Sequence, residues 1–265
     1  MSDSGVVPGP AIRFVDIEGK LEVVDLPAKK PGLPVLLLLH EGLGSVSMWR
    51  DFPQQLWRAT GSRVVAYSRH GFGRSSPRTR PWTPRFVHEE ALEVIPRLRD
   101  AMDIGRPVLV GHSTGASMAL VHAGAGRWPV AGVVAMAPLT DVQDSNAQSI
   151  RRAREIYETT AWREKLARHH DDVDAVFYGW NDTWLRPDFR SWNLREDLAG
   201  IRAPILAILG RGDEYATPDQ VETIRECATR AASFAFLHLD DCGHAPHRDR
   251  PTEVHAAVER LLGGL

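Results

Sequence analysis

One serine stands in a setting that could make it a nucleophile. Ser113 is the centre of the segment Gly111-His112-Ser113-Thr114-Gly115, which follows a buried strand-like run and opens a helix rich in small residues. A serine on a sharp strand-to-helix turn is forced outward, and glycines on both sides let backbone and helix approach closely. The five-residue pattern alone is weak, but the strand before it and the helix after it match the required setting. We therefore predict that Ser113 is a catalytic nucleophile.

A serine hydroxyl needs a general base, and the base needs a carboxylate to orient it. His244 lies after the last predicted strand, in a loop that can reach back over the carboxyl edge of a sheet, and His247 is the nearby alternative. Asp213 follows another predicted strand, at the end where catalytic groups gather in open α/β sheets. Asp141 is the second choice of acid. The chain order Ser, Asp, His is the one that accompanies a serine on such a turn.

A tetrahedral intermediate would also need two preorganised hydrogen-bond donors for its oxyanion. We expect one from the backbone N–H of Thr114, the residue after the nucleophile. The other should come from the glycine-containing loop after the strand Pro34–His40, where the N–H of Gly42 is favoured and that of Leu43 is the alternative. His40 is expected to support this loop by hydrogen bonding and not to act as a base.

Short apolar runs alternate with helical segments along most of the chain. A β-hairpin is predicted at Ile12–Ile17 and Leu21–Leu26. Continuous apolar runs, typical of strands buried on both faces, lie at Pro34–His40, Arg63–Tyr67, Pro107–Gly111, Gly132–Ala135, Pro204–Leu209 and Phe234–Leu239. Helices are predicted at Met48–Thr60, Arg85–Met102 (interrupted by Pro96), Thr114–Ala125, Pro218–Thr229 and Pro251–Leu262. The alternation predicts an α/β fold, with a mostly parallel central sheet flanked by helices on both faces.

Residues 140–198 break this rhythm. The segment contains no buried-strand run, is helical in character and holds four of the eight tryptophans. We interpret it as a helical cap inserted into a core formed by residues 1–139 and 199–265, and we call it the cap segment. Most of its aromatic side chains are expected to hold it onto the core, whereas Trp162, Trp180 and Trp184 are candidates for a substrate pocket that accepts an apolar or ring-bearing group.

The composition excludes several classes of protein. The 265 residues include 43% apolar and 25% charged residues with a net charge of −2, so no general field favours nucleic acid or an anionic membrane. The longest apolar run, Val35–Leu39, is far too short to span a bilayer. The first residues, MSDSGVVPGPAIR, lack a basic region followed by an apolar stretch, so no secretory signal is expected. We expect a cytoplasmic protein that acts on a small molecule.

Neither a disulfide nor a cofactor is expected. The two cysteines, Cys227 and Cys242, are too few for a disulfide framework and are expected to be reduced. The pair His88-Glu89 lacks the second histidine, four residues away, of a helical zinc site. We therefore predict no metal and no other cofactor, and the sequence makes no prediction of oligomeric state.

Taken together, these landmarks resemble the α/β-hydrolase superfamily over nearly the whole chain, from about Ile12 to Leu262. The matching segments are LLLHEGLGS, YSRHGFGRSS, GHSTG, GRGDEY and CGHAPH. In that family the corresponding positions are the oxyanion loop, a structural turn, the nucleophile turn, the acid and the base. Many members have His-Gly where this chain has His40-Glu41, so Glu41 is expected to add a charge near the pocket mouth.

The resemblance implies a serine hydrolase that cleaves a carboxylic ester or a related acyl compound through an acyl-enzyme. Serine at position 113 argues against the dehalogenases and epoxide hydrolases of the family, which use an aspartate nucleophile. The same motifs are compatible with a carbon–carbon bond hydrolase, a lactonase, a thioesterase or an acyltransferase. A non-catalytic binding protein that keeps the fold is the alternative from another class.

Overall fold

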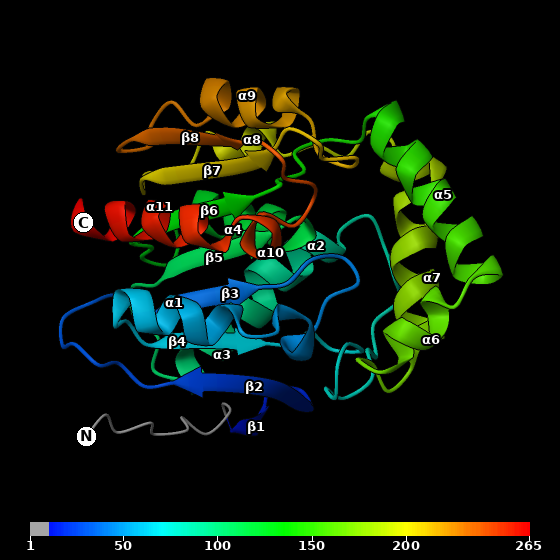
Figure 1. Ribbon diagram of the computed structural model, residues 1–265, viewed down its shortest axis with the longest axis horizontal. Coiled ribbons are helices and arrows are strands. Elements are labelled where there is room, and N and C mark those ends of the chain that lie inside the picture. The colour runs from blue at the N-terminus through cyan, green and yellow to red at the C-terminus, as the bar shows by residue number, and fades with distance from the viewer. Residues whose placement is uncertain (1–10) are drawn as a thin grey trace.

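The computed structural model describes residues 11–265, so the first ten residues of the stretch considered for a secretory signal lie outside the described part. Eight strands form one sheet in the order β1-β2-β4-β3-β5-β6-β7-β8 (Figure 1). The strands are β1 Ile12–Asp16, β2 Lys20–Leu26, β3 Leu36–Leu39, β4 Val64–Tyr67, β5 Val108–His112, β6 Gly132–Met136, β7 Ile205–Gly210 and β8 Phe234–Leu239. The β1–β2 and β2–β4 pairs are antiparallel and all other pairs are parallel, which confirms the predicted hairpin and sheet.

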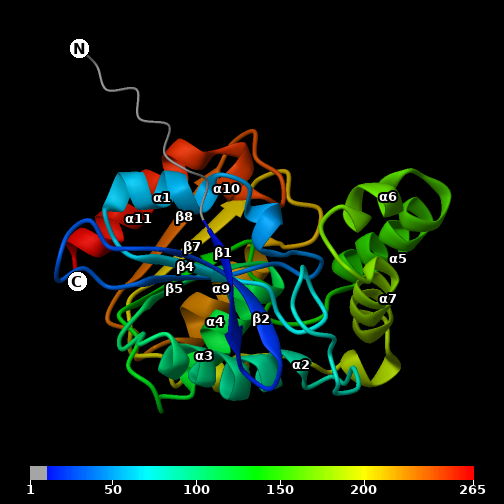
Figure 2. The ribbon, with the colours of Figure 1, turned by 90° about the horizontal axis from the view of Figure 1, so that it is seen from below.

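The central strands are apolar throughout because helices cover both faces of the sheet. Side chains alternate between the faces along a strand. Leu36 and Leu38 of β3 accordingly join one buried cluster, with residues of α1 (Phe52–Thr60) and α11 (Pro251–Gly263). Leu37 and Leu39 join the other, with residues of α3 (Ile95–Ala101) and α4 (Thr114–Gly124). Figure 2 shows the two layers of helices on opposite sides of the sheet.

Helices occupy three places around the sheet (Figure 2). On one face lie α1 Phe52–Thr60, α10 Pro246–Asp249 and α11 Pro251–Gly263. On the other lie α2 Phe86–Glu89, α3 Ile95–Ala101, α4 Thr114–Gly124, α8 Arg195–Leu198 and α9 Pro218–Cys227. Beyond the carboxyl edge of the sheet lie α5 Asp144–Thr159, α6 Trp162–Ala167 and α7 Val173–Trp184. Within residues 11–265, no helix is both long enough and apolar enough to span a bilayer.

Two predicted elements differ from the structure in detail, and the interruption predicted in a third is confirmed. The helix predicted to start at Met48 begins at Phe52, because a short 3₁₀ turn precedes it and Arg50 adopts a φ of 53°, which no helix accommodates. Pro96 does interrupt its helix, as predicted: a π-helical turn over Glu90–Val94 precedes it, and the N–H of Ile95 donates to the carbonyl oxygen of Glu90. Strand β8 was expected to be buried, but it is an edge strand and Phe236 is exposed.

The cap segment forms helices that pack on one another through aromatic rings. Tyr157 of α5 stacks on Phe177 of α7 with ring centroids 3.7 Å apart. Two further elements, the 3₁₀ turn Pro187–Phe189 and α8, lead the chain back to β7. The residues between β6 and β7 form no strand, only a single bridge between Asp141 and Asn193.

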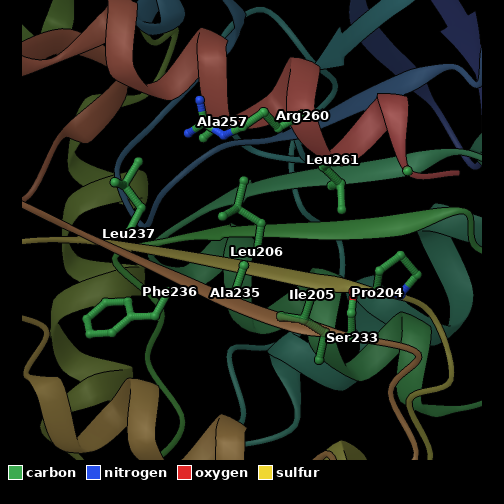
Figure 3. A pocket seen from close by; sticks show the side chains of 11 residues that line it. Pro204, Ile205, Leu206, Ser233, Ala235, Phe236, Leu237, Ala257, Arg260 and Leu261 are labelled. Carbon is green, nitrogen blue, oxygen red and sulfur yellow. The ribbon is translucent and has the colours of Figure 1, made fainter.

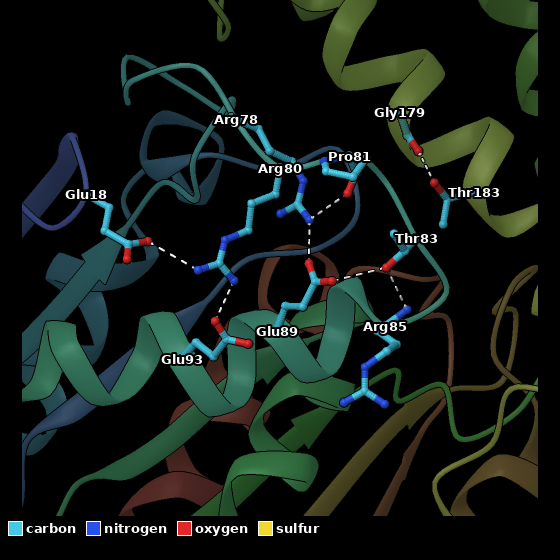
Figure 4. Close-up of polar contacts among 10 residues, drawn as sticks. All are labelled: Glu18, Arg78, Arg80, Pro81, Thr83, Arg85, Glu89, Glu93, Gly179 and Thr183. Carbon is cyan, nitrogen blue, oxygen red and sulfur yellow. Dashed lines mark hydrogen bonds and ion pairs between the residues drawn. The ribbon is translucent and has the colours of Figure 1, made fainter.

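The loop between β4 and α2 connects the core with the cap segment (Figure 4). Arg78 donates to Oε2 of Glu89 at 2.7 Å, and Thr83 Oγ1 donates to the other carboxylate oxygen at 3.1 Å. Trp82 in the same loop packs against α7 so closely that a Cβ on Gly179 would lie 2.2 Å from the indole nitrogen. The loop is thus hydrogen-bonded to Glu89 on the core side and packed against Gly179 on the cap side, so it supports α7 against the core.

Candidate active site

The turn that carries Ser113 is strained and tightly packed. Ser113 has a φ of 53° and a ψ of −120°, a backbone conformation that costs a non-glycine residue of the order of 1–3 kcal/mol. Its N–H donates to the carbonyl oxygen of Met136 on the neighbouring strand β6. A Cβ on Gly115 would lie 2.0 Å from the carbonyl oxygen of Leu39, so helix α4 can start this close to β3 only with glycine there. The prediction that glycine permits a close approach is confirmed.

The structure brings Ser113, His244 and Asp213 into one hydrogen-bonded line. Ser113 Oγ lies 2.9 Å from Nε2 of His244, and Nδ1 of His244 lies 2.8 and 2.9 Å from the two carboxylate oxygens of Asp213. The three residues come from the ends of β5, β7 and β8, which are 100 and 31 residues apart along the chain. With Nδ1–H donating to the carboxylate, Nε2 is free to accept the serine proton.

Asp213 is held as a carboxylate. Its side chain is 1% exposed, and burial alone would raise its pKa. The hydrogen bond and charge of His244, together with backbone N–H groups of Tyr215 and Ala216 at 2.8 and 2.9 Å from Oδ1, hold the pKa below its ordinary value. The acid is therefore ionised at neutral pH and fixed in position by the turn that contains it.

The two alternatives to these residues lie elsewhere. His247 is buried against His112 and Trp49, and burial lowers its pKa well below the ordinary value. Asp141 accepts a hydrogen bond from Gln220 at 3.0 Å. Neither side chain takes part in the hydrogen-bonded line at Ser113.

In the loop after β3, the backbone carbonyl groups point toward the buried Arg69 and the N–H groups of Gly42 and Leu43 point away from it. Arg69 donates to the carbonyl oxygens of His40 at 2.8 Å, of Glu41 at 2.9 Å and of Gly42 at 3.4 Å. In a planar trans peptide, the N–H points opposite to the C=O. The N–H groups of Gly42 and Leu43 therefore point away from Arg69, and neither donates a hydrogen bond to any residue in 11–265. This leaves both of the predicted loop donors available.

His40 supports the loop, as its hydrogen bonds indicate. Its Nδ1 donates to the carbonyl oxygen of Glu41 at 2.8 Å, and its Nε2 accepts from the N–H of Arg69 at 3.1 Å. Burial, with the nearby guanidinium of Arg69, keeps the pKa of His40 well below its ordinary value. The ring is therefore neutral and is engaged at both nitrogens.

Glu41 and His112 form a second carboxylate–imidazole pair beside the first. His112 donates from Nε2 to the carbonyl oxygen of His244 at 2.6 Å, and its Nδ1 lies 3.5 Å from a carboxylate oxygen of Glu41. Burial would raise the pKa of Glu41, but the neighbouring imidazoles, that of His112 first, hold it below its ordinary value. The charge expected at position 41 is thus present, and it faces an imidazole that fixes the backbone of His244.

A cavity of about 230 Å³ opens beside Ser113 and His244. The expected donor positions Gly42, Leu43 and Thr114 line it, and so do all three candidate tryptophans, Trp162, Trp180 and Trp184. Its other walls include residues that sequence reasoning missed: Met48, Leu139, Asn146, Ile150, Leu166, Tyr215 and Arg248. Nothing in the local sequence around these residues distinguishes them from ordinary packing residues, because only the fold brings them together.

Gly42 marks the contact between the oxyanion loop and the cap segment. A Cβ at this position would lie 2.3 Å from Nε1 of Trp180 on α7. No side chain fits between them, so the indole lies directly over the loop. The roof of the cavity is therefore in contact with one of the two predicted donors.

A second cavity, of about 390 Å³, lies at the other end of the sheet (Figure 3). Pro204, Leu206, Leu237 and Leu261 are among the residues that line it, between the starts of β7 and β8 and the end of α11. Among the described residues, Arg260 is the only charged one in the lining, and no histidine or acid lies beside Ser233 there. Within residues 11–265 no group of three or more His, Cys, Asp or Glu side chains could hold a metal ion. The catalytic candidates therefore gather at the first cavity.

The model of the alpha/beta hydrolase family matches residues 36–257, which include every residue of the hydrogen-bonded line and both loops around it. The chain belongs to the alpha/beta hydrolase family. The family thus confirms the resemblance found in the sequence and supports a hydrolase, without fixing which bond is cleaved.

Relatives within the alpha/beta hydrolases have diverse names. The 2-succinyl-6-hydroxy-2,4-cyclohexadiene-1-carboxylate synthase of Klebsiella pneumoniae is 26% identical and covers 88% of this chain and 95% of its own length. Esterase EstD of Thermotoga maritima is 28% identical over 88% of this chain, which spans 59% of the esterase. The enol-lactonase of Burkholderia xenovorans LB400 has the same fold, with a TM-score of 0.71, 22% identity and coverage of 96% of this chain and 100% of its own.

Proposed function

We propose that this alpha/beta hydrolase cleaves a carboxylic ester or a related acyl compound through an acyl-enzyme on Ser113. The observation that carries the proposal is the line from Ser113 Oγ to His244 and Asp213, which opens on a cavity beside unpaired backbone N–H groups. A serine needs a base, an oriented imidazole and oxyanion donors to attack an acyl carbon. All three requirements are supported by the geometry at this one place.

The reaction follows from these positions. Ser113 Oγ attacks the acyl carbon while His244 Nε2 takes the hydroxyl proton, and Asp213 stabilises the imidazolium that forms. The oxyanion lies against the N–H groups of Thr114 and Gly42. When the tetrahedral intermediate collapses, His244 returns the proton to the leaving oxygen and the ester bond breaks. A water molecule, deprotonated by His244, then attacks the acyl-enzyme; the bond from the acyl carbon to Ser113 Oγ breaks, His244 returns the proton to Oγ, and the acid is released.

Within this proposal the cap segment, residues 140–198, selects the acyl compound, because three of its tryptophans line the cavity. Aromatic walls of this kind favour a substrate with an apolar or ring-bearing portion. Catalysis by the line at Ser113 needs neither a metal nor another cofactor.

Hydrolysis of p-nitrophenyl esters from acetate to long acyl chains, by the wild type and Ser113→Ala in parallel, tests the proposal. We expect turnover by the wild type that disappears in the variant, with a chain-length preference set by the cavity. Equal turnover by both proteins would contradict it. If no ester is hydrolysed but a fluorophosphonate still labels Ser113, the carbon–carbon hydrolase and lactonase alternatives from the sequence replace the ester reaction.

A further inference from the structure

Several buried donors in the cavity wall have no hydrogen-bond partner. Asn146 is fully buried and its Nδ2 is unpaired, and Trp184 is 2% exposed with an unpaired Nε1. Both residues line the cavity that contains Ser113. The hydroxyl of Thr114 is a third such group, but it lies next to the nucleophile, at the end of the cavity where the acyl carbon would react. A buried donor without an acceptor costs about 1–3 kcal/mol, so such groups call for an explanation.

The orientation of the Asn146 amide is fixed by the start of α5. The N–H of Gln143 donates to Oδ1 of Asn146 at 3.1 Å, in a capping arrangement at the first turn of the helix. Reversing the amide would place its NH₂ against that N–H, donor against donor. The oxygen must therefore face the helix end, which leaves the NH₂ as the free group.

The two cap helices that carry these donors run antiparallel. Tyr157 near the end of α5 stacks on Phe177 in the first half of α7. Further back along α5, the carbonyl oxygen of Ile150 accepts from Nδ2 of Asn181, which lies further along α7. Contacts between the two helices that lie nearer the start of α5 therefore lie nearer the end of α7.

One helical turn beyond the contact between Ile150 and Asn181, Asn146 of α5 lies level with Trp184 of α7. Ile150 follows Asn146 by four residues, and Trp184 follows Asn181 by three, which is one helical turn in each case. The two unpaired N–H donors thus lie at the same end of the cap segment. The rest of the cavity wall includes apolar residues such as Leu139 and Leu166.

The charges around the cavity favour an uncharged acceptor. Glu41 lines the cavity and is held as a carboxylate, so it repels a second anion beside the oxyanion loop. Arg248 is the only arginine or lysine in the lining, but its side chain is 58% exposed and lies 3.5 Å from Asp249. An amide and an indole N–H are neutral donors, which match a neutral oxygen.

We propose that the cavity binds acyl substrates with a second, uncharged oxygen, such as a ketone or ether oxygen, and that Asn146 and Trp184 donate hydrogen bonds to it. The preference in kcat/KM that this inference predicts rests on the proposed acyl hydrolysis. It narrows the substrate class from any ester with an apolar portion to oxygenated acyl compounds, because a plain hydrocarbon chain would leave both donors unpaired.

The test uses p-nitrophenyl esters of equal length: hexanoate, 4-oxohexanoate, 5-oxohexanoate and the half-ester of adipic acid. We expect at least one oxo ester to exceed hexanoate in kcat/KM by about tenfold. In Asn146→Asp, which keeps the oxygen for Gln143, and in Trp184→Phe, which keeps an aromatic ring, this ratio should fall to near one. Trp192→Phe is the matched control, because the Trp192 indole nitrogen is also buried and unpaired but does not line the cavity.

Binding of the same esters to Ser113→Ala separates this inference from the reaction. If the wild type hydrolyses none of them, the ester reaction fails, and tighter binding of an oxo ester than of hexanoate to Ser113→Ala still supports the subsite. The inference is overturned if hexanoate matches every oxo ester in hydrolysis and in binding. It is also overturned if the adipate half-ester is preferred to hexanoate and to the oxo esters. A preference for the oxo ester that survives in both Asn146→Asp and Trp184→Phe would overturn it as well.

Discussion

The core loops and the cap segment bound the same cavity in opposite ways. On the core side the groups that position the reaction are held by hydrogen bonds: Asp213 by two backbone amides and His244, and the carbonyl groups of the loop after β3 by Arg69. On the cap side the wall is aromatic, and the donors of Asn146 and Trp184 are unpaired. The difference indicates that the proposed reaction depends on the core and the choice of substrate on the cap. Substitutions on the two sides should therefore affect different kinetic constants.

The largest effect is expected at the nucleophile. Ser113→Ala removes the attacking oxygen and should lower kcat by roughly 10⁶-fold, as loss of a serine nucleophile does when the three residues act as a unit. Ser149→Ala is the control, because Ser149 is half-buried and its hydroxyl donates only to the carbonyl oxygen of Glu214. Ester turnover measured for both variants decides it, and retention of more than a hundredth of the activity by Ser113→Ala would disprove the assignment.

Asp213→Asn should cost roughly 10⁴-fold in kcat. The amide NH₂ would donate to Nδ1 of His244, so the imidazole proton would move to Nε2. Nε2 could then no longer accept the proton of Ser113. Asp141→Asn, the matched change at the other acid considered, should leave kcat within about twofold. A loss of the same size in Asp141→Asn would transfer the role to that residue.

Arg69→Met should lower kcat by about 10²-fold with little change in KM. The variant frees the carbonyl groups of the loop after β3, so the N–H groups of Gly42 and Leu43 lose their fixed direction. Since Arg69 is buried, thermal unfolding must be measured alongside. Arg69→Lys should recover part of kcat, whereas a change confined to stability with normal kcat would show that the loop keeps its shape without the guanidinium.

On the cap side Trp162→Ala should behave differently. Trp162 lines the cavity and packs on Tyr157 and Phe177 of the cap segment, so kcat/KM should fall by about tenfold for long acyl chains and much less for acetate. A p-nitrophenyl ester series measures the shift in preference. An equal loss for every ester would place the tryptophan in the reaction itself and would remove the distinction between core and cap.

The smallest effect is expected at the far end of the sheet. Phe236→Ser changes an exposed side chain on the edge strand β8, beside the second cavity in the part of the sheet remote from Ser113. Both kcat/KM and the free energy of unfolding should stay close to the wild-type values. A selective fall in turnover would mean that the larger cavity also takes part in the activity.

The fold could be predicted because its strands are nearly pure apolar runs. Leu36–Leu39 and Val108–His112 are buried on both faces, which is typical of strands in a parallel sheet covered by helices. Boundaries were less predictable: Arg50 breaks a continuous helical pattern by its backbone conformation alone. The exposure of β8 depends on its place at the sheet edge, which no local pattern reveals.

The candidate site divides in the same manner. Ser113, Asp213 and His244 each follow a predicted strand, so chain order and sheet topology together bring them to one edge. Trp184 was predicted as a pocket residue, but its unpaired N–H and the place of Asn146 in the wall could not be predicted from the sequence, because they depend on partners that the two side chains lack. That absence becomes visible only when α5 and α7 are packed against the core.

The most direct test of the central claim is to trap the acyl-enzyme. The wild type is mixed with a p-nitrophenyl ester, quenched within milliseconds and examined by intact-mass measurement and peptide mapping. We predict a burst of one p-nitrophenol per protein and a mass gain of one acyl group on Ser113, both absent in Ser113→Ala. Turnover without an acylated Ser113, or an acyl group mapped to another residue with the burst preserved in Ser113→Ala, would contradict the account.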